Sequence, residues 1–596
     1  MKVSERVLKL RELMQQKGID AYLVPTADYH NSEYVGEHFK ERVFITGFTG
    51  SAGTALILKD KAGLWTDGRY FLQAESQLEG SGVELYKMGV EGVPSINEFL
   101  ESELGSGAVL GFDGRSVPFG DGVGFESIIS SKNGKVMYNL DLIDEVWADR
   151  PPLSEEPAFY LEESFSGESA ASKISRVRAE MEKVGADAHI ITTLDDTGWL
   201  LNLRGRDVEY FPMLLSYSIV YKDKVVLYVD ERKFNDDIKS KLAADNVEIK
   251  SYNDIYEDVK TISGKILIDP DRLNYAMYKN IPSGVELVEK MNPTIMMKAM
   301  KNETEIKNIK HAHIKDGVAH TKFIYWIKKL VKEGKIAQET EMSASDKLEE
   351  LRAEQGDFIC PSFGPISAYA AHAANPHYSS SEETNVSLEE GNLFLTDTGA
   401  GFMQGSTDIT RTTAIGEIPD HMKVDYTLVL QSNLRLTKAK FMYGCTGVNL
   451  DILARQPLWD RAMNYNHGTG HGVGYLGNIH ETSAGIRWQY RKNETIPFEE
   501  GMIVTNEPGL YIAGSHGIRL ENELLTKKME LNDYGQFMEF EPITFVPFDM
   551  DAIKVDMLSE EDKKDLNNYH EKVRELIGPH LTDEERAWLN EFAKEV

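Results

Sequence analysis

The stretch HGTGHGVG, residues 467–474, places two histidines four residues apart among four glycines. On a helix, His467 and His471 would point the same way, as metal-binding histidines at this spacing do. Glycine stands at every second position, and each glycine in a helix interior costs about 1 kcal/mol relative to alanine. The stretch therefore predicts extended or looped backbone, on which a histidine can come close to a metal ion or a substrate.

Two aspartates precede this stretch, and both belong to runs with strand character. Asp397 ends an apolar run in NLFLTDTG (392–399), and Asp408 lies in the strand-like run GSTDITRTT (405–413). The glycines between the two runs suit a hairpin that brings the strands side by side. We therefore expect the two carboxylates to point into one site.

Two glutamates follow the histidines. Glu507 closes the apolar strand of MIVTNEPGLY (502–511), and Glu521 is predicted to lie inside the strand of GIRLENELL (517–525). Alternation along a strand puts Arg519 on the same face as Glu521. Arg519 is therefore expected to orient the nearby carboxylates through hydrogen bonds without binding metal itself.

These acidic side chains need a counter-charge if they share one buried site. Four carboxylates carry a charge of −4, and each uncompensated buried charge costs several kcal/mol. Two divalent cations would cancel that charge, and oxygen-rich ligation with one imidazole suits Mn²⁺, Fe²⁺, Co²⁺ or Zn²⁺. Two such ions about 3.5 Å apart make water nucleophilic near neutral pH, which is the chemistry of peptide hydrolysis. The predicted metal ligands are Asp397, Asp408, His471, Glu507 and Glu521.

The amino-terminal half contains an internal repeat with a shift of 167 residues. Each copy begins with an amphipathic helical pattern and continues with a short apolar strand, AYLVP (21–25) or AHIIT (188–192). An Asp-containing loop and a segment ending near glycine follow in both copies. The matched order of elements predicts two related α/β domains.

Changes in composition mark two domain boundaries. Residues 150–165 are rich in Pro, Ser and Glu, and Asn302 stands three residues before Glu305, as a helix cap does with its reciprocal partner. Thr582 and Glu585 repeat this spacing in a tail with helical character. The expected domains are two α/β domains and one α+β domain, with bounds 1–158, 159–302 and 303–596.

The composition of the 596 residues favours a soluble cytoplasmic protein. The 96 acidic and 65 basic residues give a formal charge of −31, which repels phosphate backbones, so no nucleic acid partner is expected. Only two cysteines occur, Cys360 and Cys445, which favours a reducing compartment. The first residues lack the apolar core of a signal peptide, and no apolar run is long enough to span a membrane.

The order of the motifs DTG, TDITRT, HGTGHGVG, NEPG and GIRLEN resembles the pita-bread metallopeptidases, which include methionine aminopeptidase, prolidase and aminopeptidase P. The length, the duplicated amino-terminal domains and the phrase WLLNLRG are most similar to the three-domain, cytosolic-type Xaa-Pro aminopeptidases. The resemblance implies a strongly curved antiparallel sheet, backed by helices, with the ligands on its concave face. It also implies a homodimer.

The resemblance further implies the reaction and the metal. The enzyme would release the N-terminal residue from peptides with proline at the second position. It would use two divalent ions, Mn²⁺ first, with Zn²⁺ or Co²⁺ as alternatives. Asp397 would bind one ion, Asp408 and Glu521 would bridge both, and the other ion would be completed by His471 and Glu507.

Three further histidines would surround the substrate by the same resemblance. His377 and His480 would stabilise the developing charge or carry protons, and His467 would help form the wall that receives the proline ring. His372, five residues before His377, is an alternative to it. The stretch AAHAANP before His377 departs from the family pattern, which leaves the shape of the proline-facing pocket open.

Two other functions remain as alternatives. Prolidase cleaves Xaa-Pro dipeptides only, but prolidases usually have one amino-terminal domain of this kind. A non-catalytic pita-bread module that binds peptides would have lost the ligands, whereas this chain has all five. Metal-free creatine hydrolases are disfavoured for the same reason.

Overall fold

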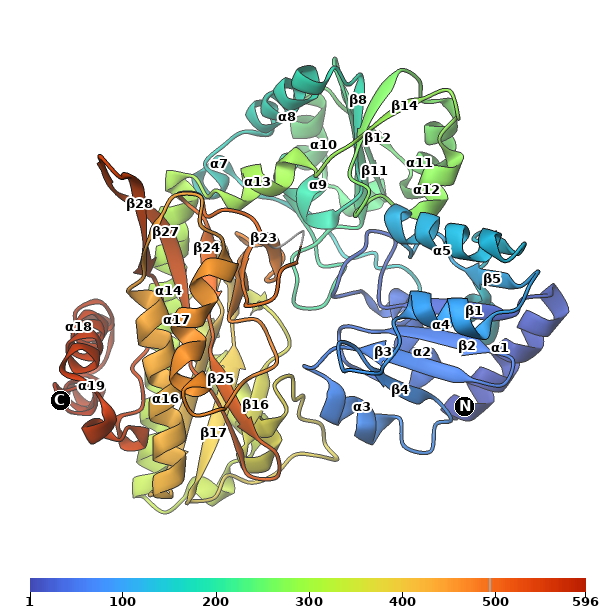
Figure 1. Ribbon diagram of the computed structural model, residues 1–596. Coiled ribbons are helices and arrows are strands. Elements are labelled where there is room, and N and C mark those ends of the chain that lie inside the picture. The colour runs from blue at the N-terminus through green and yellow to red at the C-terminus, as the bar shows by residue number, and fades with distance from the viewer. Residues whose placement is uncertain (492–494) are drawn as a thin grey trace. The chain divides into compact units, whose positions relative to one another are not determined.

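A computed structural model gives the fold of residues 1–491 and 495–596, which form two compact units, Met1–Ile295 and Met296–Val596 (Figure 1). Each unit has hydrophobic clusters of its own. Among the described residues, no helix combines the length and the apolar character that crossing a bilayer requires.

The first unit contains two six-stranded sheets with corresponding strand orders. The order is β4-β3-β2-β1-β5-β6 in the first sheet and β12-β11-β10-β8-β13-β14 in the second. The first sheet and its helices comprise α1 Val3–Lys17, β1 Ala21–Pro25, α2 Glu41–Thr46, β2 Thr54–Leu58, β3 Ala62–Thr66, α3 Phe71–Gln77, β4 Glu84–Lys87, α4 Ile96–Glu103, β5 Val109–Phe112, α5 Phe119–Ser131, β6 Lys135–Met137 and α6 Leu142–Val146. The second comprises α8 Ala170–Val184, β8 Ala188–Ile191, α9 Leu194–Leu200, β10 Ser216–Tyr221, β11 Val225–Val229, α10 Asp236–Ala244, β12 Val247–Lys250, β13 Lys265–Ile268, α12 Tyr275–Asn280 and β14 Glu286–Glu289.

The predicted duplication is confirmed in its details. In both sheets the first strand pairs antiparallel with one neighbour and parallel with the other. Helices α1 and α8 begin and end 167 residues apart, and each ends at a glycine with a left-handed backbone, Gly18 and Gly185, both with φ of 69°. Glycine adopts this conformation without strain, so both helices stop at corresponding residues.

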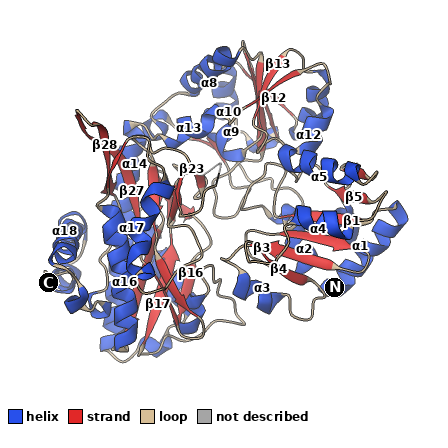
Figure 2. Cartoon of the chain, in the orientation of Figure 1, coloured by secondary structure: helices blue, strands red, loops and turns tan. Residues whose placement is uncertain are grey.

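Helices cover both faces of the first sheet (Figure 2), which explains its continuous apolar strands. Tyr22 and Val24 of β1 belong to a cluster with residues of α1 and α2. Ala21 and Leu23 belong to another cluster, with residues of α4 and α5. Alternate residues of one strand thus supply two separate cores.

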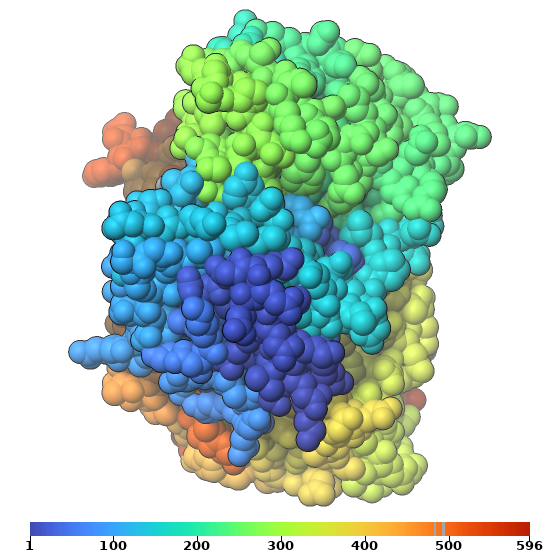
Figure 3. Space-filling model, turned by 90° about the vertical axis from the view of Figure 1, so that its right-hand side faces the viewer, coloured from blue at the N-terminus to red at the C-terminus, as the bar shows by residue number. Residues whose placement is uncertain are grey.

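The two halves of the first unit are joined by hydrogen bonds between residues that lie outside the strands. Phe119 N donates to Leu273 O over 2.7 Å, and Asn274 Nδ2 donates to Tyr29 O over 3.0 Å. Their surfaces, blue for the first and green for the second, adjoin in the space-filling view (Figure 3). The amino-terminal half is therefore one packed body built from two related domains.

The second unit begins with the long helix α14, Glu303–Lys332. Its first turn carries the predicted cap, because Glu305 N donates to Asn302 Oδ1 over 2.9 Å and Asn302 N donates to Glu305 Oε2 over 3.0 Å. Both groups would otherwise be unsatisfied at the helix start. The cap thus fixes where the helical stretch begins.

The strands of the second unit pair antiparallel throughout the described residues, and helices α14, α16 and α17 lie along one side of them (Figure 2). The sheets that carry the site have the orders β16-β17-β20 and β21-β28-β27-β24-β22-β23. This is the predicted α+β domain with a helix-backed antiparallel sheet. Its elements are α15 Glu341–Ala353, β15 Phe358–Pro361, β16 Ile366–Tyr369, β17 Asn392–Thr398, β18 Ala400–Phe402, β19 Gly405–Ser406, β20 Ile409–Ile415, α16 Asp420–Thr437, β21 Lys440–Met442, α17 Gly447–Trp459, β22 Gly470–Gly472, β23 Glu481–Ile486, β24 Ile503–Asn506, β25 Gly509–Ile512, β26 His516–Arg519, β27 Asn522–Asn532 and β28 Gly535–Pro542.

The tail forms two helices, α18 Glu560–Ile577 and α19 Asp583–Phe592. The predicted cap of the second is present, since Glu585 N donates to Thr582 Oγ1 over 3.3 Å. Leu566 and Val573 of α18 are buried in one cluster with Tyr426 of α16. The tail is therefore part of the core of the second unit.

Two buried histidines of this unit, His320 and His570, are expected to lower the free energy of unfolding in acid. Burial and the charge of Arg411 lower the pKa of His570 to about 3, and burial and Arg352 lower the pKa of His320 to about 3. A histidine of the unfolded chain has a pKa of about 6.5, so between about pH 3 and this value the unfolded state binds more protons than the folded state. Stability is therefore fully present above the unfolded pKa, and falls on acidification by about 1.4 kcal/mol per pH unit for each histidine.

Urea unfolding between about pH 6 and about pH 5 measures this slope, because this range lies below the unfolded pKa and above the folded pKa of both groups. In the variant His570→Gln, the slope is expected to decrease by the contribution of one histidine. An unchanged slope in that variant would contradict the neutral, buried state of His570.

Candidate active site

The two predicted aspartates lie on neighbouring strands. β17 pairs antiparallel with β20, so that Asp397 stands opposite Thr410, and Asp408 lies one residue before β20. The connection contains two short strands, β18 and β19, and passes close to Gly399, where a Cβ atom would lie 1.9 Å from Thr407 O. The predicted pairing of the two runs is confirmed, and glycine is needed where the chain returns.

His471 lies on β22, a three-residue strand, so the predicted extended backbone is confirmed. A Cβ atom on the preceding Gly470 would lie 1.9 Å from Thr505 O, which shows why glycine flanks this histidine. His471 Nδ1 lies 2.9 Å from Gly472 O, so the tautomer with the proton on Nδ1 leaves Nε2 as the ligand atom. Nε2 lies 3.6 Å from Glu507 Oε1.

The two glutamates lie outside the strands. Glu507 directly follows β24, and its N donates to Thr469 O over 2.8 Å. The prediction that Glu521 lies inside a strand is wrong, because β26 ends at Arg519 and β27 begins at Asn522. A strand interruption turns Glu521 toward the other ligands, and Thr410 Oγ1 donates to Glu521 Oε2 over 2.7 Å.

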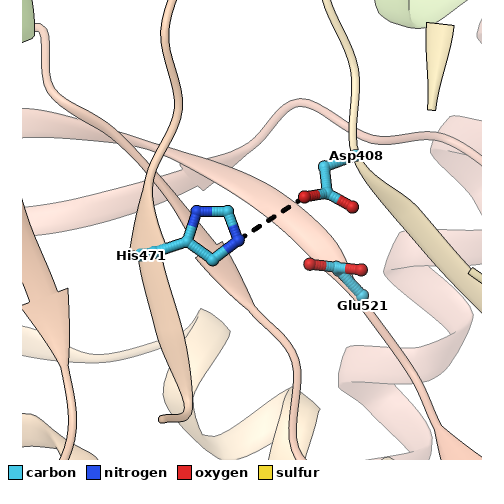
Figure 4. Close-up of side chains that lie close together, drawn as sticks. All are labelled: Asp408, His471 and Glu521. Atoms are coloured by element: carbon cyan, nitrogen blue, oxygen red, sulfur yellow. Dashed lines mark ion pairs between the residues drawn. The ribbon is translucent and has the colours of Figure 1, made fainter. Parts of the chain in front are cut away.

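Three of the predicted ligands converge tightly. The possible ligand atoms of Asp408, His471 and Glu521 all lie within 4.8 Å of one another, and His471 Nε2 lies 3.5 Å from Asp408 Oδ2 (Figure 4). Asp397 Oδ1 is buried and has no hydrogen-bond partner among the described residues. Such a buried oxygen, in a cluster of carboxylates with one imidazole, fits ligation of divalent cations.

The raised pKa values of Asp408 and Glu521 agree with a site built for cations. Burial, together with the charges of Asp397 and Glu507, raises the pKa of Asp408 well above its usual range. Burial and the charge of Asp408 likewise raise the pKa of Glu521 well above its usual range. Like charges at this spacing repel in a medium of low dielectric constant, so bound cations would favour the ionised forms of Asp408 and Glu521.

Arg519 holds the cluster on the side of Asp397. Its Nε donates to Asp397 Oδ2 over 3.1 Å, and its Nη1 donates to the hydroxyl of Tyr511 over 2.6 Å. A third bond runs from Nη2 to Pro376 O, over 3.1 Å. Arg519 therefore fixes one oxygen of Asp397 and leaves the other, Oδ1, for the cluster.

Two of the predicted substrate histidines lie beside the ligands. The ring centroids of His480 and His471 are 4.3 Å apart, with the rings edge to face. His467 Nε2 lies 2.9 Å from the hydroxyl of Tyr511, and its Nδ1 lies 4.0 Å from Glu507 Oε2.

The hydrogen-bond partners around His372 and His377 differ, and they bear on which of the two lies near the ligands. His372 Nδ1 lies 2.9 Å from Glu341 Oε1, and its ring stacks on Tyr378, whose hydroxyl donates to Glu341 Oε2 over 2.9 Å. His372 thus takes part in a network with α15. His377 directly follows Pro376, whose carbonyl oxygen binds Arg519, and this contact favours His377 as the residue near the ligands.

The unusual stretch AAHAANP forms a 3-10 helix, Ala370–Ala374, that packs on β26. A Cβ atom at Gly517 would lie 1.7 Å from Ala373 O. Gly517 therefore leaves room for this helix, and the residues after the helix place Pro376 next to Arg519.

Some residues of the site were not predicted. Glu523 Oε1 accepts from Asp408 N over 2.7 Å, and its Oε2 lies 3.1 Å from His313 Nε2, with both side chains fully buried. Thr410 and Glu523 stand two residues from predicted ligands, a spacing that alternation could have singled out. His313 lies in the middle of α14, where no local signal distinguishes it from a core residue.

Comparison with known proteins identifies four regions of the chain. The model of the metallopeptidase family M24 matches residues 307–528, and that of the C-terminal region of peptidase M24 matches residues 536–596. Two models of the creatinase/prolidase N-terminal domain match residues 6–136 and 149–305.

Relatives match over nearly the full length. Xaa-Pro aminopeptidase 1 of Dictyostelium discoideum is 38% identical over 610 residues, covering 99% of this chain and 96% of that protein. Aminopeptidase P1 of Arabidopsis thaliana is 35% identical over 646 residues, covering 100% and 99%. The crystal structure of an X-prolyl aminopeptidase from Caenorhabditis elegans, a cytosolic enzyme with a di-nuclear active site, matches with a TM-score of 0.95 at 31% identity and covers 100% of both chains. The chain belongs to the metallopeptidase family M24 and carries two creatinase/prolidase N-terminal domains before the peptidase region.

Proposed function

We propose that this chain is a dinuclear metal-dependent aminopeptidase that releases the N-terminal residue from peptides with proline at the second position. The observation that carries the proposal is the convergence of Asp408, His471 and Glu521 within 4.8 Å. The Xaa-Pro aminopeptidases that match over the full length support the substrate class. The di-nuclear site of the Caenorhabditis elegans enzyme supports two metal ions.

The five ligands would hold the two ions in the way that the family resemblance implies. Asp397 would bind one ion, Asp408 and Glu521 would bridge both, and His471 and Glu507 would complete the other. When bound, the ions supply a nucleophile derived from water near neutral pH and polarise the scissile carbonyl. Mn²⁺ is the proposed metal, with Zn²⁺ or Co²⁺ as alternatives, because oxygen ligands outnumber the single imidazole.

The substrate bond explains why a dedicated site is needed. The Xaa-Pro bond is a tertiary amide without an N–H, so a peptidase that binds its substrate as a strand loses a donor there. A site that binds the free amine, the carbonyl group and the proline ring does not need that N–H donor. His377 and His480 would donate hydrogen bonds to the carbonyl oxygen as its charge develops. His467, held by Tyr511, would line the wall for the proline ring.

An assay on an Xaa-Pro-Xaa tripeptide tests the proposal. Release of the first residue is expected with Mn²⁺, and prior removal of metal with a chelator is expected to lower the rate by at least about 100-fold. The matched control is the same tripeptide with alanine in place of proline, which should be cleaved far more slowly.

The alternatives predict other outcomes. A prolidase would cleave the Xaa-Pro dipeptide and leave the tripeptide intact. A peptide-binding module would remain inactive and metal-free in the presence of Mn²⁺. Either result would refute the proposed reaction.

We further infer a homodimer located in the cytoplasm, with domains bounded at 1–158, 159–302 and 303–596. Two exposed tryptophans support the dimer, because exposed aromatic side chains are enriched at protein interfaces. Trp459 is 40% exposed and Trp488 is 49% exposed, and their rings meet edge to face with centroids 6.3 Å apart.

The description of the Caenorhabditis elegans relative as cytosolic supports the cytoplasmic location.

A further inference from the structure

The backbone of Glu521 lies in a gap between two strands. Leu520 and Glu521 separate β26 from β27, so the regular ladder does not hold the residue. Its N donates to Thr410 O over 3.1 Å. Its carbonyl oxygen accepts from Arg411 Nη1 over 2.6 Å. The N–H of Glu521 is thus bonded to the backbone of β20, whereas its carbonyl oxygen is held by a side chain.

Arg411 is a buried guanidinium, 1% exposed, that binds several segments at once. Nη1 also donates to Thr410 O over 2.8 Å. Nη2 has three acceptors at 2.8 Å, which share its two hydrogens: Asn522 Oδ1, Val546 O and the hydroxyl of Tyr569. Its Cζ lies 4.4 Å from the centroid of the Phe548 ring. Across residues 1–491 and 495–596, no carboxylate accepts a hydrogen bond from it. The planar fork of arginine suits such a fixed set of neutral acceptors.

The tail helix α18 completes this arrangement through one hydroxyl. The hydroxyl of Tyr569 accepts from Arg411 Nη2 over 2.8 Å and from Val546 N over 3.2 Å. Its own hydrogen has three acceptors within reach, Val546 O at 2.9 Å, Thr544 O at 3.0 Å and Asn522 Oδ1 at 3.3 Å. The tail is therefore linked to the carbonyl of Glu521 by two consecutive hydrogen bonds through Arg411.

We propose that Arg411 and Tyr569 are positioning residues for the metal centre, and that the tail helix α18 thereby takes part in metal binding. This inference rests on the proposed function, in which Glu521 bridges both ions. A bridging carboxylate must satisfy two ions at once, so a shift of about 0.5 Å in its backbone weakens both bonds. Arg411 fixes that backbone, and Tyr569 fixes the rotamer of Arg411.

Titration of the metal-stripped, full-length chain with Mn²⁺ tests the proposal, with free Mn²⁺ followed by electron paramagnetic resonance. Tyr569→Phe removes one hydroxyl without changing the shape of the ring and is expected to weaken Mn²⁺ binding by about 10-fold. Arg411→Lys keeps the charge but loses the fork, and is expected to weaken binding by up to about 100-fold.

Tyr426→Phe is the matched control. Tyr426 is fully buried on α16, and its hydroxyl accepts instead from Asp549 N over 3.0 Å. This variant should lose thermal stability comparably to Tyr569→Phe but keep the Mn²⁺ affinity of the unchanged chain. A purely structural role for Tyr569 would give the two variants the same affinity.

Three results would overturn the inference. The first is a Tyr569→Phe variant that binds Mn²⁺ as tightly as the unchanged chain, and the second is an Arg411→Lys variant that does so. The third is a Tyr426→Phe variant in which Mn²⁺ binding is weakened as much as in Tyr569→Phe. Failure of the unchanged chain itself to bind Mn²⁺ would instead refute the proposed function, so the two failures are distinguishable.

Discussion

Replacement of His471 by alanine is expected to lower bound metal from two ions to about one per chain and to reduce cleavage of an Xaa-Pro-Xaa peptide by at least about 1,000-fold. The proposed ligand set has one nitrogen donor, and His471 Nε2 lies within 3.6 Å of the carboxylate oxygens of both Asp408 and Glu507. Without the imidazole, one ion loses a neutral ligand that carboxylates cannot replace without adding negative charge.

Elemental analysis of the purified variant, together with its rate on the tripeptide, measures both effects. His580→Ala is the control, because His580 is an exposed histidine of the short helix Gly578–His580 in the tail. This control should keep both ions and the full rate. A His471→Ala variant that retained two ions and more than about one-tenth of the rate would contradict the ligand assignment.

The parts of the fold that could be predicted from the sequence depend on neighbouring residues. The caps at Asn302 and Thr582 need only a partner three residues away, and both are present. The repeat could be predicted because its helices, strands and glycine stops recur at one spacing. Alternating glycines around His471 excluded a helix for the same local reason.

The parts that could not be predicted depend on pairing between distant segments. In the sequence, the stretch GIRLENELL (517–525) has the pattern of one unbroken strand, because Leu520 and Glu521 continue the alternation. The interruption is explained only by the folded structure, in which Arg411, 110 residues earlier, donates to the carbonyl of Glu521. The contact of His313 with Glu523 is likewise set by the packing of α14.

The same distinction applies to the histidines. The resemblance favours His377 over His372, but the residues alone do not separate them, since both precede Asp397 in one segment. Their partners separate them: Glu341 binds His372, while the carbonyl next to His377 binds Arg519. Glu341 belongs to α15, and nothing in its local sequence indicates that it accepts from a histidine 31 residues away.

Replacement of His480 by alanine is expected to leave both metal ions bound but to reduce kcat on the tripeptide by about 100- to 1,000-fold, with a smaller change in KM. His480 lies edge to face with His471, with ring centroids 4.3 Å apart, and is itself outside the proposed ligand set. A donor that acts mainly on charge developed in the transition state affects kcat more than substrate binding.

The contrast with His471 makes this the more selective test of the mechanism. Metal analysis and steady-state kinetics of the two alanine variants side by side should show loss of metal in His471→Ala only. His480→Gln, which keeps an N–H donor but cannot take up a proton, separates two roles of the ring. Partial recovery of kcat would mean that His480 acts by hydrogen bonding to the carbonyl oxygen, whereas no recovery would mean that it transfers a proton. Near-normal turnover in His480→Ala would exclude both roles.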